Sequence, residues 1–380
     1  MRRTWGALVA LGVVIGLVGP AHAQEAWVGG SALQGRVVVG ADGETWVGVW
    51  VDAPSVVAVP QARAPMAVSL VVDTSGSMAG DKIRNAQMAT SSLLESLSDG
   101  DLVSIYGFSN AVTEIAPPTI VSASTRGMLM QRVSLLVAGG GTNLYGGMQV
   151  GVQRISQAPP SHPVRRIFVI SDGRANVGPS DPQSLGDLAA GATEYGTQVT
   201  AIGVGYDYDP QSLNAMVVRS AGRLHHLGAP HQMASILEQE LSMMARSVAL
   251  SAHIEIVPAP GVIILSGATT GAVVVDGRLR FPLGSLVAGQ RREVLFRVRM
   301  NTAHMGPRTL ATARLVYESP TDRAPQTQTT AIRYEVTRDP RAVSAPTPRV
   351  AAMVAQHDAN VAQRRAAEQM AQGQAQQAAR

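Results

Sequence analysis

The sequence predicts an α/β unit with a doubly wound, mostly parallel sheet that is inserted in, or flanked by, an all-β sandwich and followed by a C-terminal tail. Three observations predict this fold. Apolar strand patterns alternate with helical patterns over residues 64–246, as in parallel α/β folds. Short alternating strand patterns without helices occupy residues 24–63 and 247–339. From residue 340 the composition changes to a proline linker and an Ala/Gln-rich segment.

The α/β unit begins with an apolar run, residues 66–73, which is typical of a strand buried on both faces of a sheet. An amphipathic helix is expected over 81–97, then a strand over 102–108 and a short edge strand over 112–115 that ends before two prolines. Further helices are predicted near 128–136, 144–155, 182–195, 210–220 and 231–246, with strands ending at 172 and covering 198–204 and 223–227.

The strands on either side of this unit are expected to belong together. Residues 36–60 contain two or three strands with a turn at Asp42-Gly43, and so few strands are not stable alone. Residues 249–338 show the same alternation, so we predict one β-sandwich interrupted by the α/β unit. The alternative is an independent C-terminal sandwich with the N-terminal strands packed elsewhere. The tail, residues 340–380, is expected to form a short helix with a frayed end, or to be disordered.

The first 23 residues have the pattern of a secretory signal peptide. Arg2 and Arg3 precede an apolar run that extends to Val18, and Ala21-His22-Ala23 provides a small-residue cleavage site. The alternative is an uncleaved membrane anchor, although the run is shorter than the roughly 20 residues that span a bilayer. The chain contains no cysteine, so its stability depends on packing without disulfides. We expect an exported protein, periplasmic or secreted, with no membrane span in the mature chain.

The formal net charge of +4 is concentrated at the two ends of the chain. Arg2 and Arg3 belong to the predicted signal peptide, and five arginines lie in the tail, so the body between them is close to neutral. No folded basic face is implied, which argues against a nucleic-acid partner.

Polar side chains gather where the first strand of the α/β unit ends. Asp73, Ser75 and Ser77 are two residues apart and precede a helix, at the edge of the sheet where α/β proteins bind ligands. Carboxylate and hydroxyl oxygens suit a hard divalent cation. Because hydroxyls add no charge, such a cation would keep an attraction for an outside carboxylate. The alternative is an ordinary Ser/Gly turn that caps the next helix.

Two later loops add oxygens at the same edge. Residues 138–147 are too glycine-rich for a regular element and carry Thr142 just before a helical pattern. A second buried strand ends in Asp172, which is followed by Gly173. Taken together, strand-DxSxS, GGGT and strand-SDG resemble the metal-ion-dependent adhesion site of the von Willebrand factor type A (vWA) domain family, over residues 64–246.

This resemblance implies that Ser75, Ser77 and Thr142 coordinate a metal through their hydroxyls, with Asp73 and Asp172 acting directly or through water. The implied cofactor is Mg²⁺, with Mn²⁺ or Ca²⁺ as alternatives, and an Asp or Glu of a partner completes the coordination shell. The domain order also resembles bacterial exported vWA proteins that carry a chloride-channel-like label, which is not evidence of a pore. Candidates for the ligand-binding rim are Met78, Asn143, Leu144, Tyr145, Arg174 and Asn176.

We therefore predict a binding protein rather than an enzyme: an exported, divalent-metal-dependent adhesion-type module that captures an acidic side chain of a protein or cell-surface partner. One alternative is a structural protein of an envelope assembly, in which the cation stiffens the loops. Another is a metal-dependent hydrolase, but the loops offer no His, Glu or Lys as a base at an obvious position. A second cation at Asp207 and Asp209 is less favoured than helix capping before Pro210, and His225-His226 is interpreted as a surface strand end.

Overall fold

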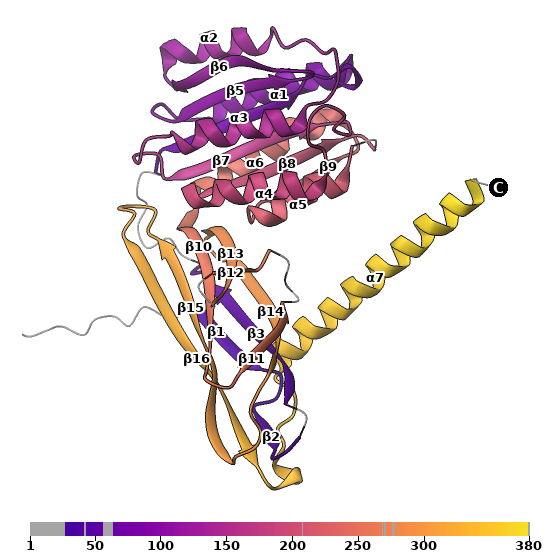
Figure 1. The fold of residues 1–380 in the computed structure, drawn as a ribbon. Helices are drawn as coiled ribbons and strands as arrows, with labels where there is room; N and C mark the ends of the chain where they lie inside the picture. Colours follow the sequence, from indigo (N-terminus) through magenta and orange to yellow (C-terminus); the bar gives the residue numbers. More distant parts are fainter. Residues whose placement is uncertain are drawn as a thin grey trace, which may run out of the picture.

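The computed structural model describes residues 27–41, 43–55, 64–206, 208–267, 269, 271–275 and 278–378. The predicted signal peptide, Asp42 of the predicted turn and Asp207 lie outside the described residues. An α/β domain sits at one end of an elongated β-sandwich, and a long C-terminal helix projects from the side of that sandwich (Figure 1).

The α/β domain contains a six-stranded sheet in the order β6-β5-β4-β7-β8-β9. Within it only β6 runs antiparallel to its neighbour. The strands are β4 (Met66–Asp73), β5 (Leu102–Phe108), β6 (Val112–Ile120), β7 (Val164–Ser171), β8 (Thr197–Val204) and β9 (Arg223–Leu227). Every residue of β4 and β7 is buried, as the apolar run at 66–73 predicts for a central strand.

Helices cover both faces of this sheet, so the predicted doubly wound arrangement is confirmed (Figure 1). One face packs against α1 (Asp81–Ser96), α2 (Ala123–Val133) and α6 (Met233–Ala245), and the other against α3 (Leu144–Ser156), α4 (Pro182–Ala192) and α5 (Pro210–Arg219). Short 3₁₀ turns lie at η1 (Gly76–Met78), η2 (Thr193–Tyr195) and η3 (Pro230–Gln232). The chain leaves β4 toward β5 on one side and reaches β7 on the other, so the carboxyl ends of β4 and β7 meet at the switch point.

Two predicted boundaries in this domain are wrong. Strand β6 continues through Pro117 and Pro118 to Ile120, because it is an edge strand and its prolines need not donate to a second neighbour. Helix α2 begins at Ala123 rather than near 128, because Ser122 forms a capping box with Thr125.

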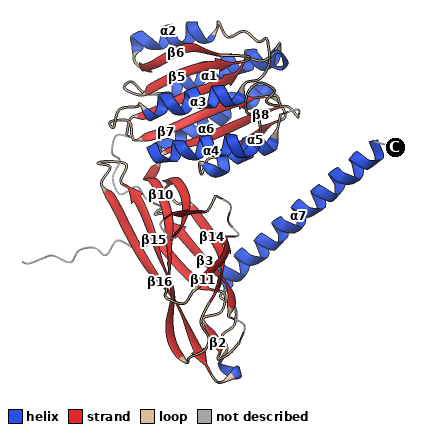
Figure 2. Cartoon of the chain, viewed as in Figure 1, coloured by secondary structure: helices blue, strands red, loops and turns tan. Residues whose placement is uncertain are grey.

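The β-sandwich is built from strands that precede and follow the α/β domain in the sequence, and Figure 2 shows them together at one end of that domain. One sheet has the order β1-β3-β14-β11 and the other β12-β13-β10-β15-β16-β2. The strands are β1 (Val28–Ala32), β2 (Arg36–Val38), β3 (Glu44–Asp52), β10 (Ser247–Pro258), β11 (Ile263–Gly267), β12 (Val273–Val275), β13 (Arg278–Val287), β14 (Arg291–Arg299), β15 (Gly306–Glu318) and β16 (Pro325–Thr337). Since β3 pairs with β14 and β2 with β16, the α/β domain interrupts a single sandwich.

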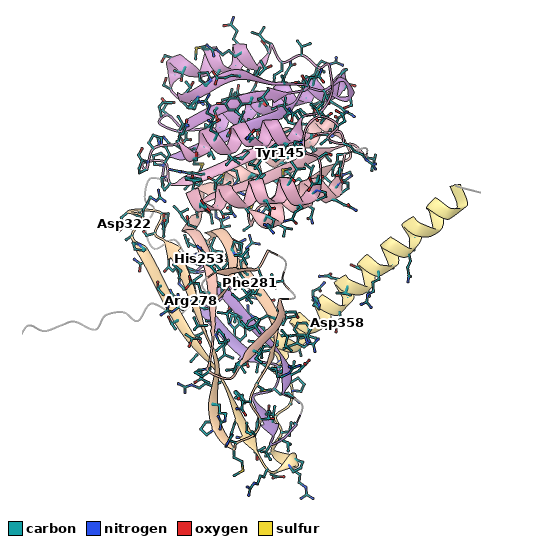
Figure 3. The ribbon with its side chains drawn as sticks, viewed as in Figure 1. Tyr145, His253, Arg278, Phe281, Asp322 and Asp358 are labelled. Carbon is teal, nitrogen blue, oxygen red and sulfur yellow. The ribbon has the colours of Figure 1, made fainter. Side chains whose placement is uncertain are left out.

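The tail forms a 3₁₀ turn, η4 (Pro340–Ala342), and one long helix, α7 (Pro348–Ala378), so both the expected short helix and the disordered alternative are wrong. Its first turns are anchored to the sandwich: Val350 and Met353 are buried over Gly48, where a methyl group would lie 2.8 Å from the Met353 sulfur. Arg349 donates to both carboxylate oxygens of Asp52 at 2.8 and 2.9 Å. Farther along, Asp358 is exposed (Figure 3). None of the helices in the described ranges is long and apolar enough to cross a bilayer.

Candidate metal centre

The three predicted loops come together at the carboxyl edge of the sheet. The Ser75 and Ser77 hydroxyl oxygens lie 3.0 Å apart, and the Ser77 hydroxyl donates to Asp172 Oδ1 at 2.7 Å. A methyl carbon placed on Gly173 would lie 3.4 Å from the Ser77 hydroxyl and 3.5 Å from the Thr142 hydroxyl. The hydroxyls of Ser77 and Thr142 therefore flank one small space that a side chain at position 173 would fill.

Asp73 is fully buried at the end of β4 and holds the first loop in place. Its Oδ1 accepts the Ser75 backbone N–H at 2.8 Å, and its Oδ2 accepts the Ser171 hydroxyl at 2.6 Å. Burial raises the pKa of Asp73, while the hydrogen bonds from Ser171 and Ser75 oppose that rise. Ser171 was not among the predicted site residues, because only the fold brings its hydroxyl to Asp73.

The glycine-rich loop is held by asparagine side chains from neighbouring loops. The Thr142 N–H donates to Asn176 Oδ1 at 2.8 Å, and the Gly141 N–H donates to Asn110 Oδ1 at 2.7 Å. The loop is also tied to the first one, since Gly76 N–H donates to the Gly140 carbonyl at 3.0 Å. Asn176 therefore positions Thr142, and Asn110 joins the site from a loop that carries no recognisable motif.

A lysine that the sequence reasoning overlooked completes the site. The ammonium nitrogen of Lys82, on the first turn of α1, lies 2.5 Å from Asp172 Oδ2. The Asp172 side chain is 0% exposed and that of Lys82 is 28% exposed, so the ion pair is largely shielded from water. The one sequence signal was a lysine just past the Ser-rich loop, at the start of the following helix.

The oxygen set fits a hard divalent cation. Six-coordinate Mg²⁺ has Mg–O distances of about 2.1 Å, so adjacent ligands lie about 3.0 Å apart. The Ser75 and Ser77 oxygens already have that separation, 3.0 Å. Within the described ranges there is no group of three or more His, Cys, Asp or Glu side chains suited to a metal, so hydroxyl oxygens are essential to this candidate centre.

Two of the six residues predicted for the ligand-binding rim are buried. Arg174 and Asn176 are exposed, while Asn143 and Tyr145 are half-buried on the α/β domain (Figure 3). Asn143 Oδ1 accepts the Gly146 N–H at 2.9 Å and so caps α3. Met78 and Leu144 are wrong as rim residues, being 0% and 1% exposed. Each stands where a loop turns into a helical segment and points into the apolar core beneath it.

The other acidic and histidine candidates have structural partners. Asp209 Oδ1 accepts the Gln211 N–H at 2.9 Å, so it caps α5, the favoured interpretation. His226 is exposed at the strand end, whereas His225 lies 3.0 Å from Glu240 Oε1 and is not a simple surface residue.

Glu240 of α6 is the centre of a buried charge cluster. Its carboxylate faces Arg166 at 3.5 Å, Arg223 at 3.4 Å and His225 at 3.0 Å. Burial alone would raise the pKa of Glu240, but the hydrogen bond with His225 and the charges of the two arginines lower it to about 2. Burial lowers the pKa of Arg166 to about 10, which leaves it charged at neutral pH.

Comparison with known sequences supports the predicted family. Residues 68–239 match the family model of the von Willebrand factor type A domain. The chain is 23% identical over 269 residues to the uncharacterized protein sll0103 of Synechocystis, an alignment that covers 68% of this chain and 63% of that protein. It is 29% identical over 196 residues to the uncharacterized protein YfbK of Escherichia coli, covering 50% of this chain and 33% of that one. The chain thus spans less than two thirds of the length of these relatives.

Solved structures share the fold of more than the α/β domain. A von Willebrand factor type A protein from Catenulispora acidiphila superposes with a TM-score of 0.69 at 17% identity, covering 84% of this chain and 76% of that one. The ArnB paralog VWA2 from Sulfolobus acidocaldarius gives a TM-score of 0.60 at 15% identity, covering 87% and 81%. Residues 68–239 are therefore a von Willebrand factor type A domain.

Proposed function

We propose that the protein is an exported, divalent-metal-dependent binding module that captures an acidic side chain of a protein or cell-surface partner. The observation that carries this proposal is the convergence of Ser75, Ser77 and Asp172, whose oxygens are linked at 3.0 and 2.7 Å across two loops. Thr142 borders the same space from a third loop. Ser75, Ser77 and Thr142 would hold the metal through hydroxyls, and Asp73 and Asp172 would act directly or through water.

The charges of the site explain why an acidic partner is expected. Asp73 and Asp172 are the carboxylates of the site, and Lys82 already neutralises one charge. Because Ser75, Ser77 and Thr142 add no charge, a divalent cation held by their hydroxyls would keep an attraction for a carboxylate from outside. Mg²⁺ is the proposed ion, with Mn²⁺ or Ca²⁺ as alternatives, because all these ligands are hard oxygens. One such contact gives direction, and the remaining affinity must come from exposed neighbours such as Arg174 and Asn176.

We also propose that the protein is not an enzyme. The three loops, residues 73–80, 138–143 and 171–178, contain no histidine or glutamate. The one lysine near these loops, Lys82, is engaged in an ion pair with Asp172 at 2.5 Å. Turnover of phosphoester or peptide substrates by the Mg²⁺-loaded protein, lost in Thr142→Ala, would contradict this part of the proposal.

The first test is metal binding by calorimetry with Mg²⁺ and Mn²⁺. Ser77 is exposed, so Ser77→Ala should keep the fold but weaken metal binding by at least about tenfold through loss of a direct ligand. Asp73→Ala should abolish binding, because Ser75 also loses the carboxylate that accepts its N–H. Ser96→Ala, at the far end of α1, is the matched control and should bind as the wild type does. Equal affinity in all variants would refute the site.

The second test separates recognition from a structural role. Envelope proteins captured on the immobilised chain with Mg²⁺ should be released by EDTA and should not be captured by Ser77→Ala. If EDTA lowers only the melting temperature and releases nothing, the cation stiffens the loops and the recognition proposal fails. Fractionation of cells tests export, which rests on the signal-peptide pattern of residues 1–23.

A further inference from the structure

Lys82 is the only lysine in the 380-residue sequence, since arginine supplies the other 30 of its 31 basic residues. This single ammonium lies at the candidate metal centre, 2.5 Å from Asp172 Oδ2. Asp172 uses its other oxygen to accept the Ser77 hydroxyl at 2.7 Å. One carboxylate is therefore shared between a candidate metal ligand and a cationic side chain.

The position of Lys82 is set by two elements. It stands directly after Asp81 at the start of α1, and it reaches across to the loop that follows β7. A methyl carbon on Gly205, at the end of β8, would lie 3.9 Å from its nitrogen. The ammonium therefore lies near the loops that follow β7 and β8, and it contacts the Asp172 oxygen that Ser77 does not use.

A buried carboxylate needs a compensating charge whether or not a metal is bound. Asp73 and Asp172 are both 0% exposed, and an uncompensated buried charge is strongly destabilising. An ammonium is a compact point charge with hydrogens that can point in several directions, whereas a guanidinium is a planar fork. Near an oxygen-lined metal site the ammonium is the better substitute for an ion, which gives a physical reason for a lysine here in an arginine-rich chain.

We propose that Lys82 is a tethered cation that neutralises Asp172 when the site holds no metal and competes with the divalent ion for it. The identity of the competing ion rests on the proposed function. Two cations beside one carboxylate repel each other, so Lys82 weakens metal binding and restricts it to high divalent-ion concentrations. In return, it keeps the metal-free site folded.

The test compares Lys82→Met with the wild type by titration calorimetry with Mn²⁺ and by thermal unfolding in EDTA. Lys82→Met should bind Mn²⁺ at least about tenfold more tightly, because one nearby positive charge is removed. In EDTA its melting temperature should fall, saturating Mn²⁺ should restore it, and the fall should be absent in an Asp172→Asn background. The matched control is Arg84→Met, which removes an exposed positive charge from the same helix. Arg84 pairs with Asp81 and not with Asp172.

The outcomes distinguish this inference from the proposed function. If the wild type binds Mn²⁺ and Lys82→Met binds it equally or more weakly, the tethered-cation proposal is overturned while the metal-dependent function stands. If only Lys82→Met binds Mn²⁺, Lys82 is a permanent substitute for the metal and the proposed function fails. If neither the wild type nor Lys82→Met binds Mn²⁺, both the proposed function and the tethered-cation proposal are overturned.

A second measurement covers the case in which Lys82→Met does not fold. Wild-type protein grown with ¹³Cε-lysine gives a single lysine signal, because the sequence has only Lys82. Displacement of the ammonium by Mg²⁺ should shift that signal in a saturable way. A signal that does not move while calorimetry records Mg²⁺ binding would overturn the proposal.

Discussion

Glu240→Gln tests whether the buried charge cluster holds the last helix of the vWA domain on its sheet. In the folded state the pKa of Glu240 is lowered from 4.5 to about 2. At about 1.4 kcal/mol per pKa unit, the ionised carboxylate contributes roughly 3 kcal/mol to the stability at neutral pH. The amide would also leave Arg166, whose side chain is 8% exposed, without its counter-charge. Breaking a buried pair in this way costs about 3–5 kcal/mol, so we expect a loss of about 3–4 kcal/mol.

The pH dependence has a definite sign. Because the folded pKa of Glu240 lies below its ordinary value, its contribution is complete above pH 4.5 and is lost as the pH falls toward about 2. The wild type should therefore lose stability across this window more steeply than Glu240→Gln, which has no carboxylate to protonate.

The assay is far-UV circular dichroism during denaturation, with tryptophan fluorescence as a second probe. The described tryptophans, Trp27, Trp46 and Trp50, all lie in the sandwich, so their fluorescence follows the other domain. The matched control is Glu238→Gln, two residues earlier on α6 and exposed, which should cost less than about 1 kcal/mol. A loss below about 1 kcal/mol in Glu240→Gln, or parallel acid-unfolding profiles, would refute the reasoning.

Two further predictions concern the metal site and the tail. Gly173→Ala places a methyl group 3.4 Å from the Ser77 hydroxyl and 3.5 Å from the Thr142 hydroxyl, which is ordinary contact distance, so the melting temperature in EDTA should change little. Because that methyl group fills the space between the two hydroxyls, the Mn²⁺ affinity should drop by about tenfold or more. Unchanged affinity by calorimetry would show that the ion does not use this space. Val350→Asp places a carboxylate in the apolar contact between α7 and the sandwich, so the start of the helix should detach. Detachment should be seen as faster tryptic cleavage at Arg349 and as altered fluorescence of Trp50, because the Arg349 guanidinium lies 4.7 Å from the centre of the Trp50 ring. Wild-type cleavage rates would contradict that docking.

Much of the fold could be predicted because local patterns and global structure agree. The nearly all-apolar run of β4 is typical of a strand covered on both faces, and the residues that follow such a strand lie at the carboxyl edge of the sheet. The Asp-x-Ser-x-Ser, Thr142 and Asp172 motifs could be placed together for the same reason, since parallel strands present their ends on one side. Boundaries at Pro117 and Ser122 failed because edge position and capping depend on neighbours in space.

The sequence by itself determined which segments are strands or helices and which oxygen-bearing loops lie at one edge, because those follow from periodicity and from the direction of parallel strands. Only the tertiary structure decided which long-range partners meet: Lys82 with Asp172, Glu240 with Arg166, and the start of α7 with Gly48. It also turned Met78 and Leu144 inward, away from the rim. Such contacts join residues far apart along the chain. They depend on side-chain direction and on the packing of separate elements, which no local pattern encodes.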